Sequence, residues 1–203
     1  EDYSADGDAW DFFPYEHARK RTYRWNEDGM AGLSDLRQDL CLSLALWNGR
    51  DEHLKERMFG LSGPQGNHGE DAKEYWWYTD ATPSHAWLSW RYHYPQAAYP
   101  YQDLLETNQQ RTRTEPEYEL CDTGIFADDR YWAVTVDYAK ESPTDIGMRI
   151  RVTNKGPEAD TIHVLPHLWF RNTWEWGRKS ALPQLWHQPM AATPGTIMAQ
   201  HWR

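Results

Sequence analysis

Four consecutive aromatic residues, Tyr75 to Tyr78, constrain the fold more than any other feature of this 203-residue sequence. Successive side chains of a β-strand point to opposite faces, so Tyr75 and Trp77 would face one way and Trp76 and Tyr78 the other. A strand with rings on both faces needs cover on both sides. Two interpretations follow: a central strand of a β-sandwich, or an aromatic surface that meets a ligand or another domain.

The residues that lead into this aromatic run are polar. They are His68, Glu70, Asp71, Lys73 and Glu74. An aromatic surface beside a carboxylate-rich loop is typical of proteins that hold sugars. Glycoside hydrolysis needs two carboxyl groups across the scissile bond, but spacing along a β-rich sequence gives no such distance. We therefore predict no catalytic pair, and we expect most acids near aromatic residues to be solvated or bonded within loops.

Composition limits the function classes. Asp and Glu number 31 against 21 Lys and Arg, giving a net charge of −10 that disfavours a nucleic-acid partner. No apolar run approaches the roughly 20 residues that a membrane span needs, and no secretory signal is recognised. The two cysteines predict a reduced pair and a cytoplasmic protein. The 13 tryptophans favour surfaces where a core meets a ligand or a partner.

Short alternating runs predict antiparallel strands. Leucines at every second position from Leu40 to Leu46 indicate a half-buried strand, and Asn48-Gly49 predicts a hairpin turn. The return strand is expected over residues 54–61. Further segments are expected as strands over 87–94, 130–138, 145–153 and 161–170, with one short helix or crossover over 101–110. The spacing and the scarcity of amphipathic helices predict a mainly β, antiparallel sandwich.

Motifs for metals and cofactors are weak. Asp6 and Asp8 lack the order and the closing Glu of an EF-hand loop. His163 and His167 lie four apart around Pro166, which predicts core or edge histidines rather than zinc ligands. No Gly-rich phosphate loop and no Gly-x-Ser-x-Gly motif is present. We predict no metal and no cofactor.

The sequence starts at Glu1 as if inside a domain and ends in a strand-like stretch over 195–203. We therefore expect a single β-sandwich domain over 1–203, truncated at both ends, from a longer polypeptide. If a neighbouring domain of that polypeptide is missing, the face that docks on it is exposed. An apolar patch of that kind is larger than soluble monomers usually tolerate, so self-association is expected.

Five stretches carry a resemblance to a known family. They are residues 1–14 (EDYSADGDAWDFFP), 23–29 (YRWNEDG), 46–50 (LWNGR), 66–75 (GNHGEDAKEY) and 168–174 (LWFRNTW). Together they resemble the N-terminal region of bacterial glucosidase-like proteins of glycoside hydrolase family 63, relatives of mannosyl-oligosaccharide glucosidase. The resemblance runs in order over nearly the whole chain.

The resemblance implies an N-terminal super-β-sandwich that packs on a C-terminal (α/α)₆ barrel. In that family the barrel carries the acid and the base of an inverting mechanism on α-glucosidic bonds, so no catalytic residue transfers to this chain. The implied partners are that barrel and an α-linked oligosaccharide. Residues expected to line the domain contact or the mouth of the sugar pocket are Tyr23, Trp25, Glu27, Asp28, His68, Glu70, Lys73, Glu74 and Tyr75.

The chain departs from the family at Trp76-Trp77, where relatives tend to have Tyr and Phe. Two other functional hypotheses stay open at this point: a stand-alone carbohydrate-binding module and a purely structural β-sandwich.

Overall fold

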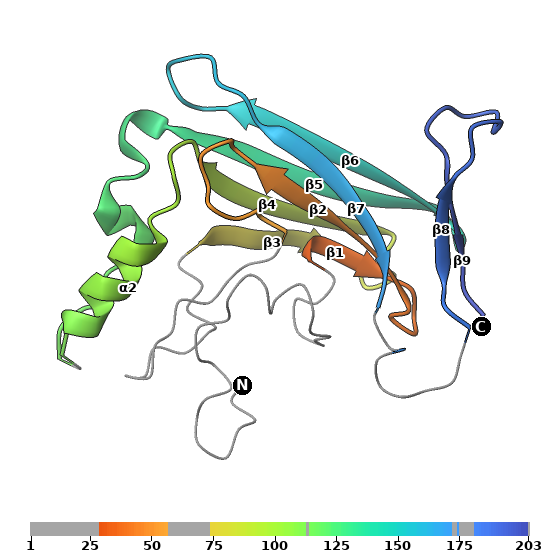
Figure 1. The fold of residues 1–203 in the computed structure, drawn as a ribbon, viewed down its shortest axis with the longest axis horizontal. Helices are drawn as coiled ribbons and strands as arrows, with labels where there is room; N and C mark the ends of the chain where they lie inside the picture. The colour runs from red at the N-terminus through yellow and green to blue at the C-terminus, as the bar shows by residue number, and fades with distance from the viewer. Residues whose placement is uncertain (1–28, 57–73, 113, 172–173, 175–180, 203) are drawn as a thin grey trace.

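The computed structural model describes residues 29–56, 74–112, 114–171, 174 and 181–202. These residues form three antiparallel sheets, so the predicted mainly β, antiparallel class is confirmed (Figure 1). The first sheet has the order β1-β2-β7, from β1 (Met30–Ser34), β2 (Leu40–Trp47) and β7 (His163–Phe170). The second has the order β3-β4-β5-β6, from β3 (Tyr75–Ala81), β4 (Trp87–Pro95), β5 (Tyr131–Ser142) and β6 (Asp145–Asn154).

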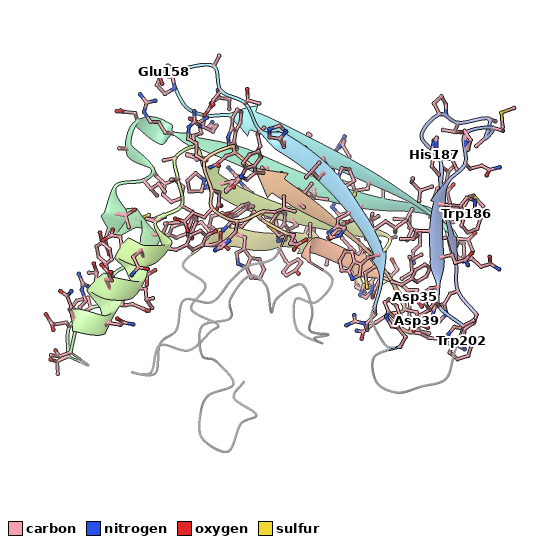
Figure 2. All side chains as sticks on the ribbon, viewed as in Figure 1. Asp35, Asp39, Glu158, Trp186, His187 and Trp202 are labelled. Atoms are coloured by element: carbon pink, nitrogen blue, oxygen red, sulfur yellow. The ribbon has the colours of Figure 1, made fainter. Side chains whose placement is uncertain are left out.

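A separate two-stranded hairpin, β8 (Gln184–His187) with β9 (Ile197–Gln200), stands beyond one end of the two larger sheets (Figures 1 and 2). At the opposite end lies α2 (Tyr101–Gln110), which packs beside the 3₁₀ turn η2 (Leu120–Thr123). A second 3₁₀ turn, η3 (Ala127–Asp129), precedes β5. The helix therefore has the predicted bounds, whereas β1 and β8 were not predicted.

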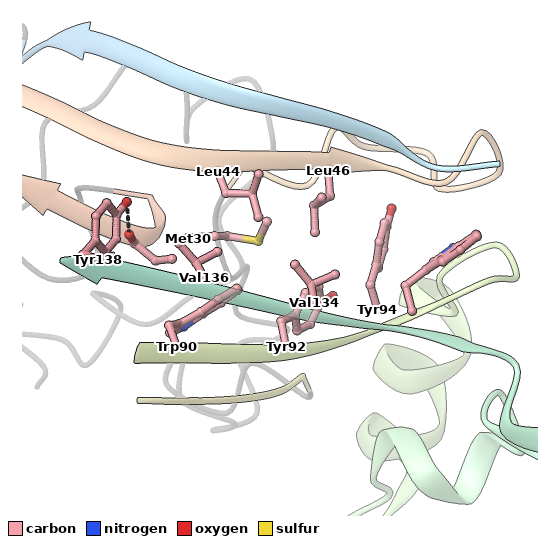
Figure 3. Close-up of a cluster of buried hydrophobic side chains, with 11 residues drawn as sticks. Met30, Leu44, Leu46, Trp90, Tyr92, Tyr94, Val134, Val136 and Tyr138 are labelled. Atoms are coloured by element: carbon pink, nitrogen blue, oxygen red, sulfur yellow. Dashed lines mark hydrogen bonds between the residues drawn. The ribbon is translucent and has the colours of Figure 1, made fainter. Parts of the chain in front are cut away.

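The main core lies between the two larger sheets, as in a sandwich (Figure 3). Alternate residues of β4 and β5 face alternate residues of β1 and β2, as the period of two requires. The buried members are Met30, Ala31, Leu44, Leu46, Trp90, Tyr92, Tyr94, Trp132, Val134, Val136 and Tyr138. One polar contact joins the sheets here, because the Tyr138 hydroxyl donates to the Ala31 carbonyl at 2.8 Å.

Strand β2 is buried on both faces, which corrects the half-buried strand predicted from its alternation. Besides Leu44 and Leu46, the opposite-facing Cys41, Ser43 and Ala45 are buried. Gly29 lies directly against Ser43: a Cβ at Gly29 would stand 2.5 Å from the Ser43 hydroxyl oxygen. This close approach, together with a φ of +77°, requires glycine at that position.

Strand β3 is an edge strand among the described residues, not the central strand of the first interpretation. Its pleat has the predicted alternation, since Trp76 packs against the main core while Trp77 faces away and is 42% exposed. Tyr78 is exposed on the same side of the strand as Trp76.

The Asn48-Gly49 turn has Gly49 at φ +78°, and the chain then returns antiparallel to β2. The return consists of a bridge between Leu46 and Lys55, whose backbone groups exchange two hydrogen bonds of 2.8 and 2.9 Å. The rest of the predicted return strand, residues 57–61, lies outside the described residues. Cys41 is buried in β2 and Cys121 is exposed in η2, and no disulfide joins them. Within the described segments, no helix has the length and apolarity to cross a bilayer.

Leu44 offers a direct test of the sandwich core because its side chain is fully buried between the sheets. Leu44→Ala should lower the free energy of unfolding by about 2–5 kcal/mol, from lost transfer energy and the cavity left behind. Urea unfolding followed by circular dichroism measures this. The matched control is Leu36→Ala, at a fully exposed position, which should change stability by less than about 0.5 kcal/mol. Equal effects of the two substitutions would contradict this core.

Candidate functional site

Two of the nine predicted contact residues, Glu74 and Tyr75, lie in the described part of the chain. The other seven lie outside the described residues: Tyr23, Trp25, Glu27, Asp28, His68, Glu70 and Lys73. Glu74 and Tyr75 are neighbours at the start of β3, so their side chains leave the strand on opposite sides. The first enters a buried polar cluster and the second joins an aromatic surface.

Most acids near aromatic residues were predicted to be solvated or bonded within loops, but Glu74 is buried inside the sandwich. Its side chain is 1% exposed, and its Oε1 lies 2.8 Å from Lys55 Nζ and accepts a 2.7 Å hydrogen bond from the Tyr92 hydroxyl. Its Oε2 is buried without a hydrogen-bond partner among the described residues. Burial raises the pKa of Glu74, and the attraction of Lys55 opposes that rise.

Lys55 is the centre of this cluster and its side chain is 0% exposed. Besides Glu74, its Nζ donates to the Tyr101 hydroxyl at 2.7 Å and lies 3.6 Å from Asp51 Oδ2. The ammonium also stands 4.0 Å from the centre of the Tyr99 ring, a cation–π geometry. The cluster therefore gives one buried cation two carboxylates, a hydroxyl and an aromatic face.

Asp51 is the second buried carboxylate of the cluster. Its Oδ2 accepts from the Tyr94 hydroxyl and its Oδ1 from the Tyr101 hydroxyl, both at 2.9 Å. The loop that carries Asp51 is fixed by Asn48, whose Oδ1 accepts from the Asp51 backbone N–H at 2.8 Å. The Asn48 amide in turn donates to the carbonyls of Pro95 and Ala97. Asn48 thus anchors the turn after β2 to the end of β4.

The tyrosines of the cluster act as neutral donors. Burial comes first, followed by the negative charge of Glu74 and, for three of the four, that of Asp51, and together they raise the pKa values of the hydroxyls far above their ordinary value. This holds for Tyr92, Tyr94, Tyr99 and Tyr101. Because they keep their protons, their O–H groups can satisfy carboxylate oxygens that have left water.

The cluster has a structural role rather than a catalytic one. Both carboxylates are buried, and their hydrogen bonds and ion pairs among the described residues run to groups of this same chain, including Lys55. A glycosidase acid or base must instead reach the scissile bond of a sugar. What the cluster does is join the loop after β2, the start of β3, strand β4 and helix α2.

Sequence reasoning missed Lys55 and Asp51. The alternation over residues 54–61 predicts an ordinary return strand for Lys55, and nothing in local periodicity distinguishes an inward lysine from an outward one. The sequence does contain one relevant pattern. Asp51 and Lys55 are four residues apart beside a turn, and residues 87–94 carry tyrosines at the alternate positions 92 and 94 that could bond to them. Recognising it would have required knowing that these segments meet.

Tyr75 lies on the outward side of β3, where its ring stacks on that of Trp77 with centroids 6.3 Å apart. Trp77 also contacts the ring of His93 at 5.0 Å, and His93 that of Tyr131 at 4.5 Å. Burial and the neighbouring Cys121 raise the pKa of Tyr75 to about 12. Its role as a contact to sugar or to another domain stays a prediction.

The two histidines of β7 occupy an edge strand among the described residues. His163 packs on Trp47 with ring centroids 5.3 Å apart, and His167 Nδ1 lies 3.7 Å from Glu56 Oε2. Strand β7 continues through Pro166, which an edge position tolerates. The described residues contain no group of three or more His, Cys, Asp or Glu side chains placed to hold a metal ion.

Comparison with known proteins gives one informative similarity. The chain is 45% identical over 184 residues to the Saccharomyces cerevisiae protein YMR196W, which is described as uncharacterized. The aligned region covers 86% of this chain but 17% of the yeast protein. No protein-family model matches the sequence, and no solved structure matches it.

Lys55→Met tests whether the buried cluster holds the sandwich together. Removing the ammonium while keeping most of the side-chain volume leaves two buried carboxylates unpaired, so the free energy of unfolding should fall by about 3–5 kcal/mol. Adding Glu74→Gln to Lys55→Met should recover part of that loss, because one uncompensated charge disappears. Lys140→Met, at an exposed position of β5, should change stability by less than about 0.5 kcal/mol. A Lys55→Met protein as stable as the parent would refute the assigned role.

Glu74 also predicts a pH dependence. Its pKa in the folded chain is raised, so between the ordinary pKa of 4.5 and that raised pKa the folded chain binds more protons than the unfolded chain. The Glu74 contribution to stability is therefore present at low pH and is lost as pH rises through the folded pKa. Urea unfolding of the parent and of Glu74→Gln from pH 4 to 8 should show their difference in free energy falling with pH.

Glu52→Gln, an exposed carboxylate three residues before Lys55, is the matched control for this titration. Its difference from the parent should not follow the same curve. A parent-minus-Glu74→Gln difference that rises with pH would mean that Lys55 outweighs burial at Glu74.

Proposed function

We propose that this chain is the non-catalytic β-sandwich domain of an inverting α-glucosidase-like glycoside hydrolase. In this proposal it packs on a catalytic (α/α)₆ barrel of the same polypeptide and helps to shape the sugar pocket. The proposal of this family rests on the five stretches that resemble family 63. The chain spans 17% of the length of the yeast relative, which leaves room for a large further domain in proteins of that kind.

The state of the described acids supports a non-catalytic role. Asp51 and Glu74 are the two buried carboxylates that lie together, and Lys55 and the tyrosines already occupy them. Neither has the solvent access that an acid or base acting on a sugar needs. In the proposed enzyme those roles belong to the barrel.

The observation that carries the domain contact is the apolar surface of the β8–β9 hairpin. Trp186 pairs directly with Met198 on one face, while Leu185 and Ile197 lie on the other, and all four are at least 40% exposed. An isolated two-stranded hairpin is marginally stable in water. The hairpin lies beyond one end of the two larger sheets (Figure 2), and in the longer polypeptide these side chains would pack against the barrel.

A free carbohydrate-binding module is the second candidate, because the ring of Trp77 is exposed beside Tyr75. Titration with malto- or nigero-oligosaccharides, followed by tryptophan fluorescence, separates the two. A module responds with a Kd of about 1 μM to 1 mM, roughly −8 to −4 kcal/mol, whereas a support domain stays silent. A purely structural sandwich would instead show low accessibility of its tryptophans to acrylamide.

The hairpin proposal predicts opposite effects of one double substitution in two settings. In the 203-residue chain, Trp186→Ser with Met198→Ser should reduce self-association, measured by sedimentation, and leave the thermal midpoint of the sandwich unchanged. In the longer polypeptide the same pair should lower the midpoint, because a buried contact is lost. Gln184→Ser, on the same face of the hairpin, should do neither. A longer polypeptide that is insensitive to the double substitution would contradict the contact.

The accompanying activity assay separates the non-catalytic role from the contact. The 203-residue chain should release no glucose from maltose or nigerose. The longer polypeptide should release it with inversion, so that β-glucose appears first in proton NMR spectra. Glucose release by the 203-residue chain would overturn the non-catalytic assignment.

A further inference from the structure

The outer face of the four-stranded sheet carries a row of residues that crosses all four strands. Trp77 of β3 lies opposite Arg91 of β4, Arg91 opposite Thr135 of β5, and Thr135 opposite Arg151 of β6. Residues directly opposite each other share a face of the sheet. The neighbouring residues Tyr92 and Val134 fill the core, so this row points away from the sandwich.

One end of the row is aromatic. Tyr75, His93 and Tyr131 join Trp77 there, and Trp77 is exposed enough to offer its ring to a ligand. His93 Nε2 is buried without a hydrogen-bond partner among the described residues. Burial, followed by the charges of Arg91 and Lys155, lowers the pKa of His93 and favours its neutral form.

The other end of the row is cationic. Arg149 and Arg151 both donate to Asp137 Oδ2, at 2.9 and 3.0 Å, and both side chains are more than half exposed. Burial alone would raise the pKa of Asp137, but hydrogen bonds from Arg149 and Ser89 and the charge of Arg151 lower it. One fixed carboxylate thus serves two arginines.

Arg91 is exposed beside Trp77, and no described carboxylate pairs with it. Two aspartates share the face with the three arginines, the buried Asp137 and the exposed Asp80 opposite Ser89, so this face keeps an excess of positive charge although the whole chain carries −10. Such a local excess is complementary to an anion.

We propose that this face binds an oligosaccharide that carries carboxylate groups. Trp77 stacks on the apolar face of one sugar ring, and Arg91 and Arg151 pair with carboxylates of the same ligand. Arginine suits this task because its planar fork bonds both oxygens of a carboxylate. Trp77 and Arg151 stand three strand spacings apart, roughly 14 Å, so the ligand is an extended chain of several rings.

The charge balance distinguishes this ligand from a single-stranded nucleic acid, which also uses aromatic rings and arginines. A nucleic acid brings one phosphate per nucleotide and needs a long basic track. This face offers three arginines within a strongly acidic chain, which suits a few separate carboxylates. The inference does not depend on whether the chain works alone or within a longer hydrolase.

The test is isothermal titration of the 203-residue chain with trigalacturonate and with its methyl ester at low salt. Trigalacturonate should bind with a micromolar to millimolar Kd that weakens as salt is added. The neutral ester should bind about tenfold more weakly or not at all. Arg91→Gln and Trp77→Ala should each weaken trigalacturonate binding by about tenfold, with unchanged thermal unfolding curves.

Arg37→Gln, which removes the same charge from an exposed turn away from this face, is the matched control and should leave the affinity unchanged. Three results would each overturn the proposal. They are equal affinity for the ester, equal loss in Arg37→Gln and Arg91→Gln, and tighter binding of an oligothymidylate of 15 nucleotides than of trigalacturonate. Absence of binding to trigalacturonate would overturn it as well.

Discussion

The pairing of the buried Lys55 ammonium with Asp51 and Glu74 is the interaction on which the α2 end of this sandwich depends. Taking Lys55 out of water costs several kcal/mol, and the attraction of Asp51 and Glu74 offsets that cost only if the remaining lone pairs are bonded. Tyr92 and Tyr94 supply those bonds. Because the partners come from separate segments, the charge is stable only when the loop after β2, strand β4 and the start of β3 are all in place.

The same cluster explains why the core face of β4 changes from leucine and tryptophan, at Leu88 and Trp90, to tyrosine at Tyr92 and Tyr94. Trp90 packs in the dry middle of the sandwich, whereas Tyr92 and Tyr94 lie where the apolar core meets the buried charges. A tyrosine buries its ring like an apolar residue and still carries a donor at its tip. Phenylalanine would fill similar space but would leave Glu74 Oε1 and Asp51 Oδ2 each with one donor fewer.

Sequence patterns predicted the elements whose residues alternate strongly, such as β2 and β6, and the helix α2 with its bounds. They failed where the decisive contact joins residues that are far apart in the sequence. Lys55 looks like any residue of a return strand, and its burial follows from segments that approach only after folding. The edge position of β3 was equally hidden, because rings on both faces of a strand reveal how it is pleated but not which strands lie beside it.

The aromatic run at the start of β3 also shows how a pleat separates two functions that the sequence places side by side. Glu74 and Tyr75 looked like parts of one sugar-contacting surface, yet successive residues of a strand leave on opposite sides. Glu74 therefore belongs to the internal support of the sandwich. Tyr75 and Trp77 belong to its outer face, where the charged neighbours are arginines of β4 and β6 rather than the adjacent acid. An acid and a ring in the same strand share a face only if their residue numbers differ by an even number.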